Sequence, residues 1–338
     1  MQTSFRKWWH QTLAENWGFL LVLGSALIRV LVFQTPLKIK HSPLNLPPYF
    51  HQWQQRFLDS SSSSDPLGLH RGIFLGFTKG IPRPVFDAFK EGGLTHLVAA
   101  SGFNCWIVGA LFIFLSRSIS PRGTPWTTFI DRFCQCLGAW LFWSWTEQSP
   151  PVTRAAVFLT IKALLVSLGI RVGFSRLLSI QYLLSICIAP DLARNASFQL
   201  TFGCLFGIAA ATAACRPRIN LLLSSLSLAW KPATKTILIY LATSMGACLG
   251  VAPTTWFVFG EVNFTSLLTN WLAVPPVTFI IMPLGLLQMM ALAPNVALLN
   301  DVATFLGHLG GMFCGWYFEV LKFWIGMIPH LRYAPFRY

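Results

Sequence analysis

Three polar side chains that could do chemistry, His96, Ser101 and Asn104, lie in the segment 92–105, which reads GGLTHLVAASGFNC. A serine and a histidine can form a nucleophile and its general base. The same groups can also line a polar path through a membrane or anchor a contact between helices. On a helix, His96, Ala100 and Asn104 would share one face, because they follow one another at four-residue spacing. Gly102 weakens a helix and allows close backbone approach, so we interpret it as a helix break.

Other polar residues interrupt apolar stretches farther along the chain. A charged group at the bilayer centre costs at least about 2.5–3.5 kcal/mol, so polar groups inside spans usually face the bundle interior or a pathway. Arg154 follows two prolines at the start of its apolar run, and it could instead extend to the membrane interface. The alternative for the segment 92–105 is a small-residue helix contact with a polar anchor. We expect these residues to line an internal path: His96, Ser101, Asn104, Arg154, Gln199 and Asn270.

The composition predicts a polytopic membrane protein. Of 338 residues, 54% are hydrophobic and 11% are charged, against roughly 45–50% and about 25% in soluble domains. The net charge of +14 would suggest nucleic acid binding in a soluble domain, but Lys and Arg also accumulate in the cytoplasmic loops of membrane proteins. The eight cysteines and seven histidines show no metal-ligand spacing. We therefore expect no metal site, no disulfide framework and no cofactor.

Apolar runs of bilayer-spanning length recur through the chain. They cover about 17–33, 95–115, 130–146, 151–169, 175–190, 196–215, 236–259, 264–290 and 297–328. We therefore expect an all-α, polytopic protein with about 8–9 transmembrane segments. If the spans alternate, the basic loops fall on one side, which places the N-terminus in the cytoplasm and the segment 34–93 outside. The first run lacks a cleavage site, so residues 1–33 are interpreted as a transmembrane anchor, and residues 329–338 as a C-terminal tail.

The expected extracytoplasmic segment, 34–82, is short and is divided by a serine-rich linker, DSSSSSDP, at 59–66. After it, the stretch 83–93 reads RPVFDAFKEGG and places Val85, Ala88, Phe89 and Gly92 on one helix face. This pattern is typical of an amphipathic helix that lies on a membrane surface. We expect it to lie on the outer surface and to lead into the segment 92–105.

Three prolines, Pro275, Pro276 and Pro283, interrupt the apolar run near 264–290. Proline removes a backbone donor and breaks helices, and broken helices at membrane depth line cavities or are packed in protein. We predict a discontinuous or re-entrant helix here, with a merely kinked span as the alternative.

Two short stretches suggest an enzyme instead. AASG, which contains Ser101, and GHLGG at 307–311, which contains His308, resemble the serine and histidine motifs of rhomboid intramembrane proteases. Ser101 would be the nucleophile and His308 the base, in hydrogen-bond contact between two spans. About 200 residues separate the two, several spans more than the compact rhomboid core has, and the other rhomboid signatures are missing. We therefore predict no catalytic residue in this chain.

Four stretches, in order, resemble the ComEC family of competence proteins. FKEGGLTHLVAASGFNCWIVG resembles the family signature, in which an amphipathic helix leads into a His, a Ser-Gly pair and a span. PPVTRAAVFLTI is similar to the start of its arginine-bearing span, and APDLARNASFQLTFGCLFGIA to its Phe-Gln-Leu-Ser-Phe segment, with Thr201 in place of the serine. GVAPTTWFVFGEVNFTSLLTNWLAVPPVTFIIMPLG is similar to its block of Pro, Phe-Gly, Asn and Pro. We interpret residues 83–328 as a competence-type transmembrane channel domain.

The resemblance implies a non-enzymatic DNA-uptake channel of natural transformation in the cytoplasmic (inner) membrane, which passes single-stranded DNA without hydrolysis. It implies single-stranded DNA and membrane lipid as ligands, and a DNA receptor, a cytoplasmic translocation motor and a separate nuclease as other proteins; a homo-oligomer is left open. The outer segment is too short for the family's OB-like domain, and no histidine cluster marks a metallo-β-lactamase-like domain. Asn104 stands where the family often has a second histidine. A permease for another anionic solute is the alternative function.

Overall fold

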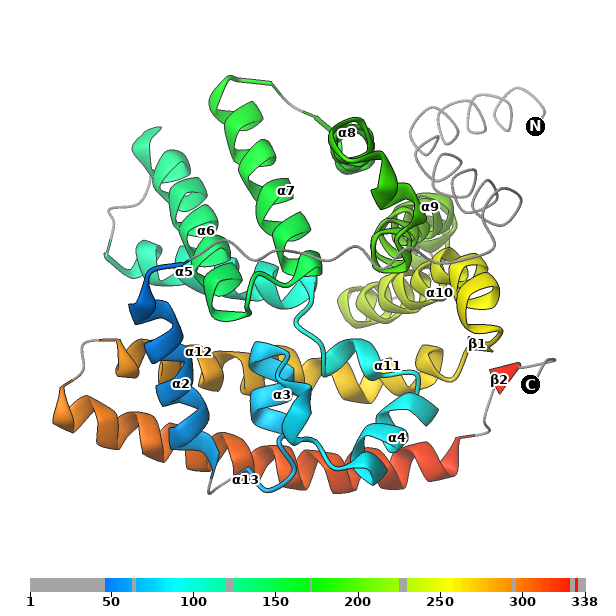
Figure 1. The fold of residues 1–338 in the computed structure, drawn as a ribbon. Coiled ribbons are helices and arrows are strands. Elements are labelled where there is room, and N and C mark those ends of the chain that lie inside the picture. The colour runs from blue at the N-terminus through cyan, green and yellow to red at the C-terminus, as the bar shows by residue number, and fades with distance from the viewer. Residues whose placement is uncertain are drawn as a thin grey trace, which may run out of the picture. The chain divides into compact units, whose positions relative to one another are not determined.

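The computed structural model describes residues 46–62, 65–119, 125–170, 172–224, 230–293, 296–328 and 332–333 (Figure 1). The expected anchor at 1–33 and most of the expected tail at 329–338 lie outside these residues. The α-helices are α2 (Pro48–Ser62), α3 (Leu69–Leu75), α4 (Arg83–Glu91), α5 (Gly102–Ile119), α6 (Pro125–Trp145), α7 (Pro150–Ser167), α8 (Phe174–Ile188), α9 (Ala196–Ser224), α10 (Lys231–Phe259), α11 (Ser266–Pro276), α12 (Met282–Leu292) and α13 (Ala297–Met327). The other described elements are three 3₁₀ turns, η1 (Thr78–Gly80), η2 (Thr95–Leu97) and η3 (Pro190–Arg194), the π-helical segment η4 (Val277–Ile281), and the antiparallel pair β1 (Val262–Asn263) and β2 (Arg332–Tyr333). The prediction of an all-α protein is confirmed.

Within the described residues, four helices are long and apolar enough to cross a membrane. They are Pro150–Ser167, Ala196–Ser224, Lys231–Phe259 and the continuous helix Ser266–Leu292. Two shorter apolar helices, Gly102–Ser118 and Phe174–Ile188, coincide with two further predicted spans. The runs predicted at 130–146 and 297–328 are helical as well, as α6 and α13, but they are not among these four helices.

The chain forms two compact units, which are described separately. Unit 1 comprises Met1–His41, Arg171–Leu267 and Leu331–Tyr338, and unit 2 comprises Ser42–Ile170 and Leu268–His330.

Unit 1 is organised around the antiparallel pair α9 and α10. Gly207 lies against Gly246 and Gly250 so closely that a Cβ atom at Gly207 would collide with the carbonyl oxygen of Gly246. Small residues allow such backbone approach between membrane helices. Beside them, the ring of Tyr182 on α8 packs on Phe198 at a centroid distance of 5.3 Å, which attaches α8 to the start of α9.

Unit 2 is built on α12 and α13, which run alongside each other with α2 and α3 packed against them (Figure 1). The core between them is aromatic: Phe74 on α3 stacks on Phe57 at 5.2 Å and meets Phe142 of α6 edge-on at 5.8 Å. A Cβ atom at Gly285 of α12 would lie 2.5 Å from the ring of Phe74, so the glycine makes room for it.

The amphipathic helix expected at 83–93 is present as α4, with Val85 and Phe89 buried and Asp87 exposed. Its apolar face packs on protein: Phe89 stacks on Phe318 of α13 at 6.3 Å with rings nearly parallel. The buried face of α4 therefore contacts protein. Contact with a membrane surface remains a prediction for the opposite, exposed side, which includes Phe86.

The serine-rich linker expected at 59–66 begins later than predicted, because α2 continues to Ser62. The hydroxyls of Ser60 and Ser61 donate to the carbonyl of Phe57 at 3.1 and 2.9 Å, within their own helix. Serine favours linkers in an isolated chain, but here burial against α12 decides the conformation.

The discontinuous or re-entrant helix predicted near 264–290 is not observed. The chain stays helical from Ser266 to Leu292 and passes through a π-helical segment, η4 (Val277–Ile281), where the N–H of Met282 donates to the carbonyl of Val277. Pro275 and Pro276 cannot donate helical hydrogen bonds, and a wider π turn directly after them accommodates that loss without ending the helix. The structure has one continuous helix here, and the alternative of a kinked span agrees with it in that respect.

Candidate functional site at residues 92–105

The segment 92–105 connects α4 to α5 through the turn η2. The expected shared helix face of His96 and Asn104 is not formed, because residues 98–101 are not helical and α5 begins only at Gly102. Gly102, predicted as a helix break, is therefore the first residue of a helix. His96 lies on η2 with its side chain exposed.

Ser101 and Asn104 hold this segment in place. The Oγ of Ser101 accepts the backbone N–H of Asn104 at 3.2 Å, which caps the first turn of α5. Asn104 is 2% exposed, and its Nδ2 donates to the carbonyl of Ile73 at 3.0 Å. That carbonyl belongs to the last turn of α3, where a helix leaves its carbonyls without internal partners. The two side chains thus join the ends of two helices.

The start of α7 packs against the same place. The hydroxyl of Ser149 donates to the carbonyl of Ala100 at 3.4 Å. A Cβ atom at Gly102 would lie 3.2 Å from the Cβ of Ala155, which places the N-terminal turns of α5 and α7 beside each other. Neither helix carries an acidic residue in its first turn. Because the N-terminus of a helix carries a partial positive charge, the two ends together form a region of positive potential.

Arg154 supplies a positively charged residue in the second turn of α7. It directly precedes Ala155 on α7 and is partly exposed. Two stretches that resemble the same family in the sequence, 92–105 and the start of α7, are therefore adjacent in unit 2. This juxtaposition of two helix N-termini and a guanidinium group can attract a phosphate or another anion.

Another stretch that resembles the family, the one that contains α11, also contacts the segment 92–105. Thr269 donates from its Oγ1 to the carbonyl of Gly92 at 2.7 Å, and both groups are buried. Asn270 is the next residue on α11 and is partly exposed. Gln199, the remaining expected path residue, belongs to unit 1, where it is buried and its Nε2 donates to the carbonyl of Ala193 in η3. The path-lining role of all six residues stays a prediction.

Ser101 and His308 do not form the hydrogen bond that a catalytic dyad requires within the part of the chain that the structure describes. Ser101 caps α5, and His308 lies on the exposed side of α13. Neighbouring glycines of the GHLGG stretch have a packing role instead. A Cβ atom at Gly310 would lie 2.6 Å from the ring of His70, and one at Gly307 would lie 2.6 Å from the Nε2 of Gln288.

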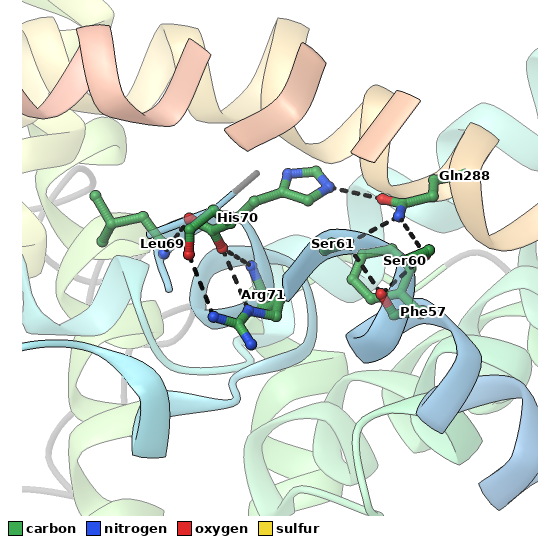
Figure 2. Close-up of polar contacts among 8 residues, drawn as sticks. Phe57, Ser60, Ser61, Leu69, His70, Arg71 and Gln288 are labelled. Atoms are coloured by element: carbon green, nitrogen blue, oxygen red, sulfur yellow. Dashed lines mark hydrogen bonds and ion pairs between the residues drawn. The ribbon is translucent and has the colours of Figure 1, made fainter. Parts of the chain in front are cut away.

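A buried polar network around His70 was missed by sequence reasoning (Figure 2). The Nε2 of His70 donates to the Oε1 of Gln288 at 2.9 Å, while the Nε2 of Gln288 donates to the hydroxyls of Ser60 and Ser61 at 3.0 and 2.8 Å. His70, Ser61 and Gln288 are completely buried. The tautomer of His70 follows from the amide orientation of Gln288, since the amide oxygen can only accept. The network locks α2, α3 and α12 together.

Asp65 closes the other side of this network. Its Oδ1 accepts the N–H of Leu69 at 3.0 Å at the start of α3, and its Oδ2 lies 3.5 Å from the Nε of Arg71. Burial is the main cause that lowers the pKa of His70 below its ordinary value, and the charge of Arg71 lowers it further, while Gln288 and Asp65 raise it. His70 is thus held neutral as a structural group. The available signal in the sequence was the glycine pair 307 and 310, which leaves room for a buried side chain.

Among the described residues, no group of three or more His, Cys, Asp or Glu side chains could hold a metal ion. The helices of membrane-spanning length and the all-helical architecture define an α-helical membrane protein. A family model described as Competence protein matches residues 73–335, so this chain belongs to the competence protein family.

Two curated relatives extend this finding. The chain is 24% identical to ComE operon protein 3 of Bacillus subtilis (strain 168) over 276 residues, which cover 80% of this chain and 31% of the relative. It is 30% identical to Competence protein ComA of Neisseria gonorrhoeae over 110 residues, which cover 32% of this chain and 16% of the relative. The chain thus aligns with less than a third of the length of either relative. No solved structure matches it.

Proposed function

We propose that this protein passes single-stranded DNA across the cytoplasmic membrane as part of a multi-pass DNA-uptake channel in natural transformation. Its family membership, the names of its two relatives and its membrane-length helices support this role. The observation that carries the proposal is the meeting of the α5 and α7 N-termini beside Arg154 at the segment 92–105.

A DNA strand presents one negative charge per nucleotide, so a channel needs positive potential without strong sequence-specific contacts. Helix N-termini supply that potential together with backbone donors, and Arg154 supplies a planar fork of donors that suits phosphate oxygens. Glu147, the acid nearest in sequence, is exposed in the turn before α7 and outside its first helical turn.

The expected path residues then divide into two roles. His96, Arg154 and Asn270 are at least partly exposed and are proposed to contact the strand. Ser101 and Asn104 are proposed as positioning residues, because their polar atoms already hold the backbone of the segment. For Gln199, which is buried in unit 1, we propose a path-lining role through the backbone that it holds at η3.

In the proposed role the chain is non-enzymatic, and partner proteins supply the driving force for DNA transport. Its sequence contains no P-loop motif for nucleotide hydrolysis. A DNA receptor, a cytoplasmic motor and a nuclease are therefore assigned to separate proteins, and a homo-oligomer is compatible with this arrangement.

The test compares Arg154→Gln with Lys162→Gln in a naturally competent host that lacks its own channel gene. Lys162 is a matched control, since it lies on the same helix and the substitution removes the same charge away from the segment 92–105. We expect R154Q to lower the amount of fluorescent DNA that reaches the cytoplasm by about 10-fold or more, because hydrogen bonds to charged groups contribute about 1.5–3 kcal/mol. R154K should retain part of the uptake.

Protein levels in the membrane fraction are measured for every variant. Equal uptake by R154Q and K162Q at equal protein level would contradict the role of Arg154. The same positive site would also suit a permease for another anionic solute. Unchanged DNA uptake after deletion of the whole gene, with reduced accumulation of a labelled anion, would favour that alternative.

A further inference from the structure

A pocket in unit 1 lies between the end of α9 and the start of α10. Its volume is about 320 Å³, near the lower end of the range for small-molecule sites, roughly 300–1,000 Å³. The lining residues are Thr212, Ala213, Arg216, Ile219, Asn220, Lys235, Ile239 and Ala242.

The cations of this pocket are available to a ligand. Arg216 and Lys235 are exposed, and neither forms an ion pair with any residue that the structure describes. The sequence from 196 to 259, which covers both helices and their connection, contains no Asp or Glu. Two cations of one pocket that lack a neighbouring acid favour an anionic ligand.

The position of the pocket along the helices points to a membrane ligand. Arg216 directly follows the apolar run 196–215, and Lys235 directly precedes the run 236–259. In two antiparallel spans, both charges therefore stand at the same boundary between the hydrocarbon region and the headgroups. Basic pockets between membrane helices at this depth bind phospholipid headgroups.

The remaining lining residues suit a molecule with a charged head and an apolar body. Ile219 and Ala242 are buried and form an apolar wall, while Asn220 is exposed beside the cations. Pro217 cannot donate the helical hydrogen bond to the carbonyl of Ala213, so this acceptor lacks its usual helical partner. Sites for single-stranded nucleic acid stack bases on aromatic rings, and no aromatic residue lines this pocket.

We infer that this pocket binds the headgroup of an anionic phospholipid, with its phosphate between Arg216 and Lys235 and its first methylene groups against Ile219. A headgroup hydroxyl, as in phosphatidylglycerol, can donate to the carbonyl of Ala213. This inference does not rest on the proposed function.

The experiment measures lipid binding to the purified full chain in mild detergent by native mass spectrometry, with phosphatidylglycerol and phosphatidylcholine as the probes. The double variant R216Q/K235Q is compared with R218Q/K231Q, which removes the same charge at the same end of the helix pair outside the pocket. We expect R216Q/K235Q to weaken phosphatidylglycerol binding by about 20-fold, since each basic residue near a membrane surface contributes about a factor of five. R218Q/K231Q should change it less than threefold, and phosphatidylcholine binding should not change.

A charge-conserving variant, R216K/K235R, separates lost binding from lost folding, because it should bind phosphatidylglycerol nearly as well as the unmodified chain. Equal weakening by both glutamine double variants would overturn the pocket, as it would show that only the summed charge matters. Loss of phosphatidylglycerol binding in R216K/K235R would also overturn it. If a short single-stranded oligonucleotide displaces the lipid and its binding depends on the same two residues, the ligand of the pocket is nucleic acid and the lipid proposal is overturned.

The readout contains no DNA uptake, so failure of the lipid site leaves the proposed function untouched. Conversely, uptake that does not respond to Arg154 leaves the lipid site standing.

Discussion

The side-chain amide of Asn104 joins two helices through one hydrogen bond. It is buried, it donates to the carbonyl of Ile73 at the end of α3, and its own backbone is capped by Ser101. A buried carbonyl without a donor carries a desolvation cost that folding does not recover. At the residue scale, the segment 92–105 therefore depends on Asn104 for its shape before any ligand is present.

We expect Asn104→Ala to lower the free energy of unfolding by about 1–3 kcal/mol, because the carbonyl of Ile73 stays buried without its donor. Asn104→His should cost less, since the Nδ1–H of a histidine can occupy the place of the amide nitrogen. Thermal unfolding in detergent measures both. Equal losses in the two variants would show that the hydrogen bond is not what Asn104 contributes.

His70 makes stability depend on pH. Burial lowers its pKa in the folded protein, so the unfolded chain takes up the proton more readily, and stability should fall as the pH drops below about 6.5. His70→Gln keeps a donor for the network but does not titrate, so its stability should vary less between pH 7.5 and 5. The midpoint of unfolding at each pH measures the effect.

His51→Gln serves as the control, because His51 is exposed on α2. It should leave the acid-induced loss of stability unchanged. An identical pH profile for H70Q and the unmodified protein would locate the sensitivity elsewhere.

At the scale of elements, two features shape the long helices: close packing of one pair, and a local distortion where a break in the helix was expected. The pair α9 and α10 approaches through Gly207, Gly246 and Gly250, while α11 and α12 are joined through the π segment η4. The π segment keeps the helix continuous after the prolines, so backbone groups stay hydrogen-bonded within the helix, as a membrane requires. Prolines inside a span therefore changed its hydrogen-bond register and did not end it.

Gly207→Ala should strongly reduce the amount of folded protein in the membrane, because the added methyl group collides with the backbone of α10. Backbone cannot move aside as a flexible side chain can, so we expect a loss of about 3 kcal/mol or more. Gly315→Ala is the matched control in another helix, where a Cβ atom would meet nothing within 4 Å. It should be neutral or stabilising by about 0.5–1 kcal/mol. Comparable loss in both variants would argue against close packing as the cause.

At the scale of the whole molecule, the charges at the ends of the helices predict how the protein is oriented in the membrane. Arg216, Arg218, Lys231 and Lys235 gather at one end of α9 and α10. Basic loops remain in the cytoplasm, and the segment 34–93 is expected on the opposite side. The proposed lipid pocket would then face the inner leaflet, whose anionic lipids attract such charges.

Reporter fusions test this orientation. Alkaline phosphatase fused after residue 93 should be active, and fused after residue 224 it should be inactive, because the enzyme matures only outside the cytoplasm. Green fluorescent protein at the same two positions should give the reverse pattern. Activity on the same side for both positions would contradict the predicted alternation.

Local patterns in the sequence were enough for the class of protein and for several elements. The helical spans at 151–169, 196–215 and 236–259 follow from length and hydropathy alone, and α4 follows from the spacing of Val85 and Phe89. The family resemblance rested on four ordered stretches and is confirmed over residues 73–335. These features depend on neighbouring residues, so they can be read from the chain directly.

What the sequence by itself determined is the all-α membrane fold, the family and the places where polar groups interrupt apolar runs. Only the tertiary structure decided which of those groups meet. His70 and Gln288 are 218 positions apart and form one buried network, Gly102 meets Ala155, and Ser101 caps a helix without reaching His308. Periodicity records how a side chain is oriented on its own helix, whereas a contact between distant helices depends on packing, and packing is decided by the shapes of all the residues between them.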